Sequence, residues 1–369
     1  HAPRPQPKKT RTRTLARTPS PRRTMRAAVA ALALGFAAAS PIAQKYGVSS
    51  ATWSWRFKGM PELHKEGRDG EDYKVRYQSL KLDDGKKRPK AILVHGFGGN
   101  CEHWRKVMPM LAPAADCYAI DLLGFGYSEK PTPRVDTPYE PAKFYNFDNW
   151  GTQLLDFMDE VVDDDAFLIT NSVGGIAAMS AALQNAQDPR RRRVRGVQLM
   201  SPSLRMLHKE KQPPISRPFT SALQWTLRET KIGNAFFGQV ATMNGVRSVL
   251  KECYGDANAV TDELVEAILK PGLEPGATEV FLDFISYSSG PLPERQLAGM
   301  KGAGVPVSIL WGDKDPWEPI DMGKQLLGPE AHPDVVEEFV TLPGLGHCPM
   351  DESPDMVVPR IREFVERHA

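Results

Sequence analysis

One serine stands where a strand-like segment meets a pair of glycines. Residues 165–170 read "DAFLIT", an apolar run typical of a buried strand, and "NSVGG" (171–175) follows. Ser172 and Gly174 match the last two fixed positions of the nucleophile elbow G-x-S-x-G, a sharp turn that exposes a serine hydroxyl. Thr170 replaces the first glycine. The motif alone therefore fits either a nucleophile or a serine that caps the following helix.

A second glycine-rich stretch follows an earlier strand-like run. It reads "VHGFGGN" (94–100). Acyl transfer on a serine needs backbone N–H groups aimed at the developing oxyanion, one from such a loop and one from the residue after the nucleophile. We therefore expect the N–H groups of Phe97 and Val173 to form an oxyanion hole. His95 lies close by, and we interpret it as a structural loop residue.

Acid and base candidates follow two later strand-like segments. The string "WGDKDPWEP" (311–319) offers Asp313 and Asp315. Asp315 precedes a proline in the loop that leaves the sheet, so we expect it to orient a base, whereas Asp313 faces solvent or caps the turn. The base candidate is His347, in the glycine-rich string "LPGLGHCPMDESP" (342–354).

The three candidates occur in the chain order serine, aspartate, histidine. This order is one of those in which a catalytic triad is known to occur. We expect His347 to take the proton of Ser172, the serine to attack an ester carbonyl, and Asp315 to stabilise the imidazolium. This chemistry needs no metal and no cofactor. A serine at the elbow favours acyl transfer, since dehalogenases and epoxide hydrolases with this arrangement use an aspartate there.

The elements that must position these residues alternate between strand and helix from about residue 75. This alternation predicts an α/β fold with a mostly parallel sheet flanked by helices, whose functional residues gather at the carboxyl ends of the strands. The expected strands lie within 90–99, 116–126, 165–170, 195–201, 305–312 and 336–344, and helices are expected within 146–162 and at the C-terminus.

Residues 202–301 break this rhythm with amphipathic, helix-like segments joined by proline and glycine. We expect them to form a helical cap inserted into a core made of 51–201 and 302–369. The cap's aromatic residues form its own core or line a cavity for an apolar substrate. Its apolar faces could also rest on a membrane, although the sequence marks no clear basic amphipathic helix. The substrate-contact candidates are Phe219, Trp225, Phe236, Phe237, Phe281 and Phe284.

Charge is unevenly spread along the 369 residues. Residues 1–50 hold ten Lys or Arg and no acid, which leaves −8 for the rest of a chain whose net charge is +2. A mildly acidic folded part argues against nucleic-acid binding. The basic start, rich in Thr, Ser and Pro, and the short apolar run "AAVAALALGFAAAS" predict a bipartite plastid presequence within 1–50. An endoplasmic-reticulum signal starting at Met25 and a disordered basic tail are the alternatives.

Longer strings show a resemblance to a known family. The strings "HGFGGNCEHWRKVMPMLA", "IDLLGFGYSEKP", "RMLHKEKQP", "VTDELVEAILKPGLEPGA" and "LPGLGHCPMDESP" resemble plastid α/β-hydrolases of the chlorophyll dephytylase and pheophytinase-like group. The resemblance runs from about Trp53 to the C-terminus and implies a triad of Ser172, Asp315 and His347. It also implies a phytylated tetrapyrrole as substrate and a chloroplast location, in the stroma or on the thylakoid membrane. Another lipophilic ester, a hydrolase-like ligand receptor and the secretory pathway remain the alternatives.

Overall fold

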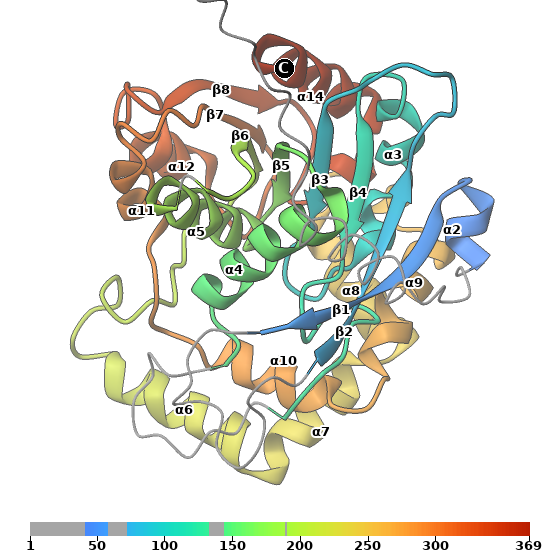
Figure 1. Ribbon diagram of the computed structural model, residues 1–369. Coiled ribbons are helices and arrows are strands. Elements are labelled where there is room, and N and C mark those ends of the chain that lie inside the picture. Colours follow the sequence, from blue (N-terminus) through green and yellow to red (C-terminus); the bar gives the residue numbers. More distant parts are fainter. Residues whose placement is uncertain (1–40, 58–71, 133–143, 189) are drawn as a thin grey trace, which may run out of the picture. The chain divides into compact units, whose positions relative to one another are not determined.

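The computed structural model describes residues 41–57, 72–132, 144–188 and 190–369 (Figure 1). Most of the presequence expected within 1–50 lies outside the described residues, so it stays a prediction. The fold itself begins before residue 50, with helix α2 (Pro41–Lys45) and a strand that starts at Ser49. Ala43 and Val48 are buried, which explains why this segment packs onto the fold.

An eight-stranded sheet forms the centre of the fold. Its strand order is β1-β2-β4-β3-β5-β6-β7-β8; β3 to β8 are parallel, whereas β1 and β2 are antiparallel. The predicted mostly parallel sheet is confirmed. The strands are β1 (Ser49–Arg56), β2 (Asp72–Leu80), β3 (Lys90–Val94), β4 (Asp116–Ile120), β5 (Ala166–Asn171), β6 (Val194–Met200), β7 (Val307–Gly312) and β8 (Val336–Leu342).

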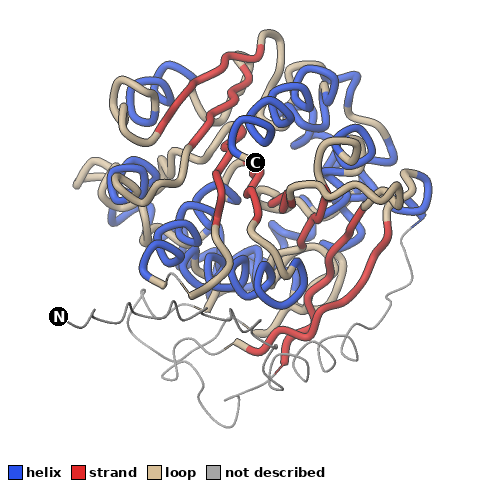
Figure 2. The backbone as a smooth tube through the Cα atoms, turned by 45° about the horizontal axis from the view of Figure 1, so that its top comes forward, coloured by secondary structure: helices blue, strands red, loops and turns tan. Residues whose placement is uncertain are grey.

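Helices cover both faces of this sheet (Figure 2). Alternate residues of each central strand enter two different apolar cores, Ile92 and Val94 on one face and Ala91 and Leu93 on the other. Helices α4, α5, α11 and α12 lie on the first face, and α3 and α14 on the second. The helices outside the insert are α3 (Val107–Leu111), α4 (Phe147–Phe157), α5 (Gly174–Gln187), α12 (Ile320–Leu327), α13 (Pro349–Glu352) and α14 (Pro354–His368).

A helical insert separates β6 from β7, as the break in the sequence pattern predicts. Its last helix differs from the expected cap, because the Gln296 amide donates to the Ile176 carbonyl of α5 at 3.0 Å and Leu297 is fully buried. That helix, α11, therefore packs with the core, and the cap ends before residue 293. The helices of the insert are α6 (Arg217–Glu229), α7 (Lys231–Val240), α8 (Met243–Cys253), α9 (Asp262–Gly272), α10 (Ala277–Ile285) and α11 (Pro293–Gly299).

The insert is anchored to the core unevenly. Leu264 and Val265 of α9 are fully buried, and the Asn100 amide donates to the Ala267 carbonyl of the same helix at 2.8 Å. Helix α6, by contrast, has no buried residue. Figure 1 shows α6 and α7 on the outside of α10, at the bottom of the view. Within the described residues, none of the helices combines the length and apolar character that a membrane crossing requires.

Candidate active site

Ser172 lies in a tight turn between a strand and a helix. Strand β5 ends at Asn171 and α5 begins at Gly174, so two residues make the connection. The φ of Ser172 is +54°, in the left-handed region that costs a non-glycine residue about 1–3 kcal/mol. Its N–H donates to the Met200 carbonyl of β6 at 3.0 Å, which holds the turn against the sheet. The turn has the strained geometry of a nucleophile elbow.

Two glycines let neighbouring chain segments approach this turn. A Cβ on Gly96 would lie 2.9 Å from the Ser172 Cβ, and a Cβ on Gly174 would lie 2.5 Å from a backbone oxygen of the loop after β3. Both positions therefore require glycine. Thr170, which replaces the first glycine of the motif, is buried and donates its hydroxyl to the Gln198 carbonyl at 3.1 Å. The sheet thus accommodates a threonine at that position.

His347 and Asp315 form a buried pair beyond the carboxyl ends of β8 and β7. The distance from His347 Nδ1 to Asp315 Oδ2 is 2.7 Å, and the two side chains are 6% and 0% exposed. The other oxygen of Asp315 accepts two backbone N–H groups of the following turn, at 3.0 Å each. The fixed carboxylate holds the ring with its proton on Nδ1, which leaves Nε2 to act as a base. Asp313 instead accepts the backbone N–H of Gly344, in the loop after β8, at 2.7 Å.

Asn171 ties the serine turn to the histidine loop. Its amide donates to the His347 carbonyl at 2.9 Å and to the Met200 carbonyl at 3.2 Å. The N–H of His347 in turn donates to the Cys253 carbonyl, at the end of α8, at 2.8 Å. The histidine loop is therefore held by the elbow on one side and by the insert on the other. No role was predicted for Asn171, although its place directly before the serine was an available signal.

Glu318, a partly buried acid with no role predicted from the sequence, joins the aspartate loop to the start of the insert. One of its oxygens accepts the Ser203 hydroxyl and the other accepts the Leu204 N–H, both at 2.9 Å. Burial raises the pKa of Glu318, and these hydrogen bonds oppose part of the rise. Ser201 and Arg205, which flank the contact, have φ values of +42° and +55°. Glu318 thus anchors strained backbone where the chain leaves the sheet.

The two backbone groups expected to bind an oxyanion lie in the loops that flank Ser172. Val173 is the N-cap residue of α5, so its N–H is among those that have no acceptor within the helix. The ring of Phe97 stacks on Phe284 of α10, with centroids 4.7 Å apart and planes 17° apart, and lies 5.1 Å from Phe281. The loop that carries the Phe97 N–H is therefore packed directly against the insert.

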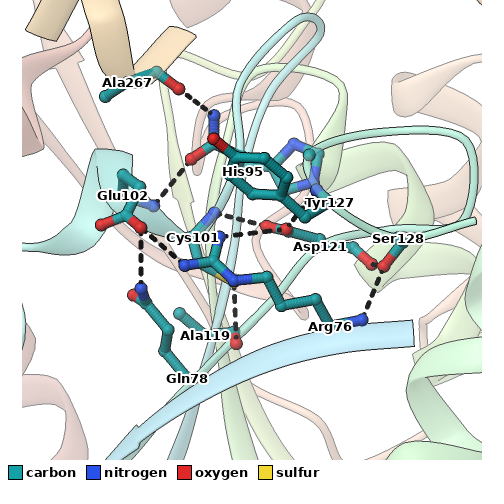
Figure 3. Close-up of polar contacts among 12 residues, drawn as sticks. Arg76, Gln78, His95, Cys101, Glu102, Ala119, Asp121, Tyr127, Ser128 and Ala267 are labelled. Atoms are coloured by element: carbon teal, nitrogen blue, oxygen red, sulfur yellow. Dashed lines mark hydrogen bonds and ion pairs between the residues drawn. The ribbon is translucent and has the colours of Figure 1, made fainter. Parts of the chain in front are cut away.

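Buried charges hold the far end of the same loop (Figure 3). Arg76 of β2 lies between two carboxylates, with Nη2 2.6 Å from Glu102 Oε1 and Nη1 3.3 Å from Asp121 Oδ2. Asp121 also accepts the N–H groups of Cys101 at 2.6 Å and Tyr127 at 2.8 Å. Burial opposes charge on Asp121, but Arg76 and these hydrogen bonds outweigh it and lower the pKa of the carboxyl group. The charged network therefore fastens the loop after β3 to the loop after β4.

His95 serves the backbone of these loops. Its Nε2 accepts the Leu122 N–H at 3.0 Å, which leaves Nδ1 to donate to the Gly96 carbonyl at 2.8 Å. Burial lowers the pKa of His95, so the ring is neutral at pH 7. With both nitrogens bonded to the backbone, His95 fits the structural role expected for it.

Three of the aromatic candidates for substrate contact form a group that reaches the loop after β3. We call this loop the oxyanion loop, because it carries the N–H of Phe97 that is expected to bind an oxyanion. The ring of Phe237 lies 5.1 Å from that of Phe281, and both Phe281 and Phe284 contact Phe97. Phe236 stands at the margin of the group, 6.4 Å from Phe281. A continuous set of rings therefore runs from α7 through α10 to the loop after β3.

Within the described residues, the remaining two candidates make no ring contact with this group. Phe219 and Trp225 are 76% and 62% exposed on α6, and their contact with a substrate stays a prediction. An apolar pattern predicts that a helix has an apolar face, but it does not say what that face contacts.

Comparison with known proteins places this fold and site in a family. Residues 91–360 match the Alpha/beta hydrolase family. The chain therefore belongs to the α/β hydrolase family.

Individual relatives are distant. A hydrolase of Bacillus subtilis (strain 168), YugF, is 24% identical over 280 residues, which is 76% of this chain and 90% of the relative. A chloroplastic pheophytinase of Arabidopsis thaliana is 24% identical over 306 residues, which is 75% of this chain but 61% of the pheophytinase. A crystal structure of a bacterial membrane phospholipase A superposes with a TM-score of 0.59 at 18% identity, over 94% of this chain and 93% of that one. At this identity the likeness shows the fold alone.

Proposed function

We propose that this chain is a serine carboxylic-ester hydrolase with Ser172 as nucleophile, His347 as base and Asp315 as the orienting acid. The observation that carries the proposal is the buried pair of His347 and Asp315, 2.7 Å apart, at the edge of the sheet where Ser172 sits in its strained turn. Asn171 joins the two parts of this arrangement through the His347 carbonyl. The family assignment supports hydrolysis as the class of reaction.

The proposed reaction has two halves. His347 takes the hydroxyl proton as Ser172 attacks the ester carbonyl, and Asp315 stabilises the imidazolium. The N–H groups of Phe97 and Val173 stabilise the oxyanion of the tetrahedral intermediate. The imidazolium then gives its proton to the leaving alcohol as the carbon–oxygen bond breaks. Water, deprotonated by His347, attacks the acyl-enzyme and releases the acid.

The phytyl ester of a chlorophyll-type pigment is the substrate that we propose. Phytol is a long branched alkyl alcohol, so its ester needs an extended apolar surface beside the nucleophile. The rings of Phe237, Phe281 and Phe284, continuous with Phe97, offer such a surface. The relation to a pheophytinase supports the same substrate class, and the word chloroplastic in that relative's name supports a plastid location.

The first experiment compares pigment and simple esters on the full chain. We would incubate the protein with chlorophyll a, pheophytin a and p-nitrophenyl acetate in detergent, and measure phytol, dephytylated pigment and p-nitrophenol. Ser172→Ala removes the proposed nucleophile. Ser221→Ala is the matched control, because Ser221 is an exposed serine of α6.

Each outcome decides a different part of the proposal. Pigment products from the parent and Ser221→Ala, but not from Ser172→Ala, would support both the serine mechanism and the substrate. Turnover of p-nitrophenyl acetate alone would keep the hydrolase and reject the pigment, in favour of another lipophilic ester. No turnover of any ester would reject the enzyme and favour a ligand receptor.

A further inference from the structure

Helices α6 and α7 present large apolar side chains to solvent. Within the described residues α6 buries none of its side chains, and Gly233 is the one buried residue of α7. We call this surface the outer cap face. The residues that define it are Ile215, Phe219, Leu223, Trp225, Ile232 and Phe236, which are 42–81% exposed. Six large apolar side chains exposed on and just before two helices that pack against each other mark an interaction surface rather than ordinary surface composition.

Charge on this face is opposite in sign to that of the folded chain. Helices α6 and α7 carry one acid, Glu229, and three basic residues, whereas the chain beyond residue 50 carries −8 overall. Arg228 is ion-paired to Glu229 at 3.1 Å. Arg217 and Lys231 are exposed and form no ion pair with the part of the chain that the structure describes. The apolar helices are thus flanked by cations.

The outer cap face is continuous with the proposed active site. Helices α6 and α7 both pack against α10. Phe236 and Phe237 of α7 contact Phe281 of α10, whose ring lies 5.1 Å from the Phe97 ring. An apolar molecule that reaches α7 from outside therefore meets an unbroken run of aromatic rings leading to the oxyanion loop.

We propose that the outer cap face docks onto an anionic lipid bilayer. Exposed aromatic and aliphatic side chains would lie at the level of the head groups, and Arg217 and Lys231 would contact lipid phosphates. Docking itself does not depend on Ser172; the further step, in which a lipophilic ester passes from the bilayer along α7 and α10, rests on the proposed function. The bilayer then supplies both the surface for docking and the substrate.

Charge argues against two other occupants of this face. A second copy of the chain in a two-fold dimer would set the same cations against each other. Residues 1–40 hold nine Lys or Arg and no acid, so their positive charge would also be repelled by the cations of this face. An anionic bilayer satisfies the apolar and the basic side chains together.

The test is flotation of the full chain with vesicles of phosphatidylcholine alone or with 30% phosphatidylglycerol. We expect binding to the anionic vesicles that weakens with added salt, and at least tenfold less binding to the neutral ones. Leu223→Ser with Ile232→Ser, and separately Arg217→Glu with Lys231→Glu, should each lower binding at least tenfold. The matched control is Leu82→Ser with Lys324→Glu, also at exposed positions but far from the cap in sequence, and it should stay within twofold of the parent.

Three results would overturn the proposal. The first is a loss of vesicle binding in the control variant equal to that in the cap variants, and the second is unchanged vesicle binding in both cap variants. The third is a dimer, detected by analytical ultracentrifugation, that dissociates in the Leu223→Ser variant. Thermal unfolding of each variant shows whether it is folded. The Ser172→Ala protein should float like the parent. Hydrolysis of p-nitrophenyl acetate without vesicles is measured alongside, so that failure of docking and failure of the proposed esterase are separate results.

Discussion

The edge of the sheet that carries the proposed active site, which we call the catalytic edge, and the outer cap face differ in how their side chains are packed. At this edge, the carboxylates of Asp121 and Asp315 are buried and that of Glu318 is partly buried, and each accepts at least two hydrogen bonds. On the outer cap face, apolar side chains such as Leu223 and Ile232 are 59% exposed. Hydrogen bonds and ion pairs fix the side chains of the first region, whereas the second region leaves apolar side chains exposed to water.

This difference separates two tasks. Ester hydrolysis needs a nucleophile, a base and oxyanion donors held in a fixed geometry, because small displacements lose much of the rate. A lipophilic substrate needs a surface that can meet an apolar phase. Helix α10 lies between the two regions, since Phe281 contacts Phe237 on one side and Phe97 on the other. Substitutions that distinguish the regions test this division.

The largest effect is expected at the strained serine. Ser172→Ala should lower the kcat for p-nitrophenyl acetate by roughly 10⁴- to 10⁶-fold, because no other group replaces the proposed nucleophile. Ser172→Gly should abolish activity equally, yet unfold at a higher urea concentration than Ser172→Ala, because glycine accepts a φ of +54° at no steric cost. The expected gain in the free energy of unfolding is about 1 kcal/mol. Equal stability of the two variants would show that the turn stores no strain.

The next largest effect is expected at the buried charges behind the oxyanion loop. Arg76→Met should lower the free energy of unfolding by about 3–5 kcal/mol, because it leaves Asp121 and Glu102 buried without their counter-ion. The matched control is Arg56→Met on β1, which breaks an exposed pair with Asp72 and should cost at most about 1 kcal/mol.

The same pair of variants has an expected pH dependence. The pKa of Asp121 is lowered in the fold, so its contribution is present above its unfolded pKa and is lost as the pH falls. The difference between parent and Arg76→Met, measured by urea unfolding, should therefore shrink below about pH 4. A constant difference from pH 7 to pH 3 would mean that Arg76 acts by packing alone.

Much of the catalytic edge could be predicted from the sequence because its signals are local. An apolar run followed by "NSVGG" marks a strand, a turn and a helix, and the carboxyl ends of parallel strands must share one edge. The structure brings Asp315, rather than Asp313, to His347, as the loop position indicated. Strands β1 and β2 were not assigned, although Trp53 and Trp55 of β1 alternate with polar residues.

Other features depend on contacts between distant segments, which no short pattern records. Glu318 binds residues more than a hundred positions earlier, and Asn171 binds the carbonyl of His347. The packing of α6 is of the same kind: its main contacts are with α7 and α10, and Phe219 and Trp225 are left largely exposed. Pattern gives the polarity of a face, and only tertiary packing decides what covers it.

An intermediate effect is expected at His103, a buried histidine beside the oxyanion loop. Burial is the main cause that lowers the pKa of His103 from 6.5 to about 4. A neutral ring in the fold contributes stability that is complete above pH 6.5 and is lost as the pH falls toward 4. Between pH 7 and pH 4.5 the parent should lose about 2–3 kcal/mol more than His103→Gln in urea unfolding. An equal loss of the free energy of unfolding in the two proteins over this pH range would show that His103 does not cause the pH dependence.

A smaller effect is expected at the boundary between the two regions. Phe284→Leu removes the ring that stacks on Phe97, so the oxyanion loop loses one of its supports. We expect about a tenfold loss of kcat for p-nitrophenyl acetate, roughly 1.4 kcal/mol, with KM changed less than about twofold. Phe144→Leu is the matched control, because Phe144 contacts Phe57 and Tyr73 instead. Equal kcat losses in the two variants would indicate general destabilisation.

The smallest effect is expected on the outer cap face, where the same substitution can be made at an exposed and a buried leucine of the insert. Leu223→Ser should change the free energy of unfolding by no more than about 0.5 kcal/mol, because Leu223 is 59% exposed. Leu264→Ser, at a fully buried position of α9, should cost about 3 kcal/mol or more. Urea unfolding of the full chain measures both. Similar costs at the two leucines would mean that α6 is covered in solution, and the outer cap face would then have no apolar surface to offer a membrane. A negligible cost at Leu223 together with lost vesicle binding would mean that this leucine acts in docking and not in folding.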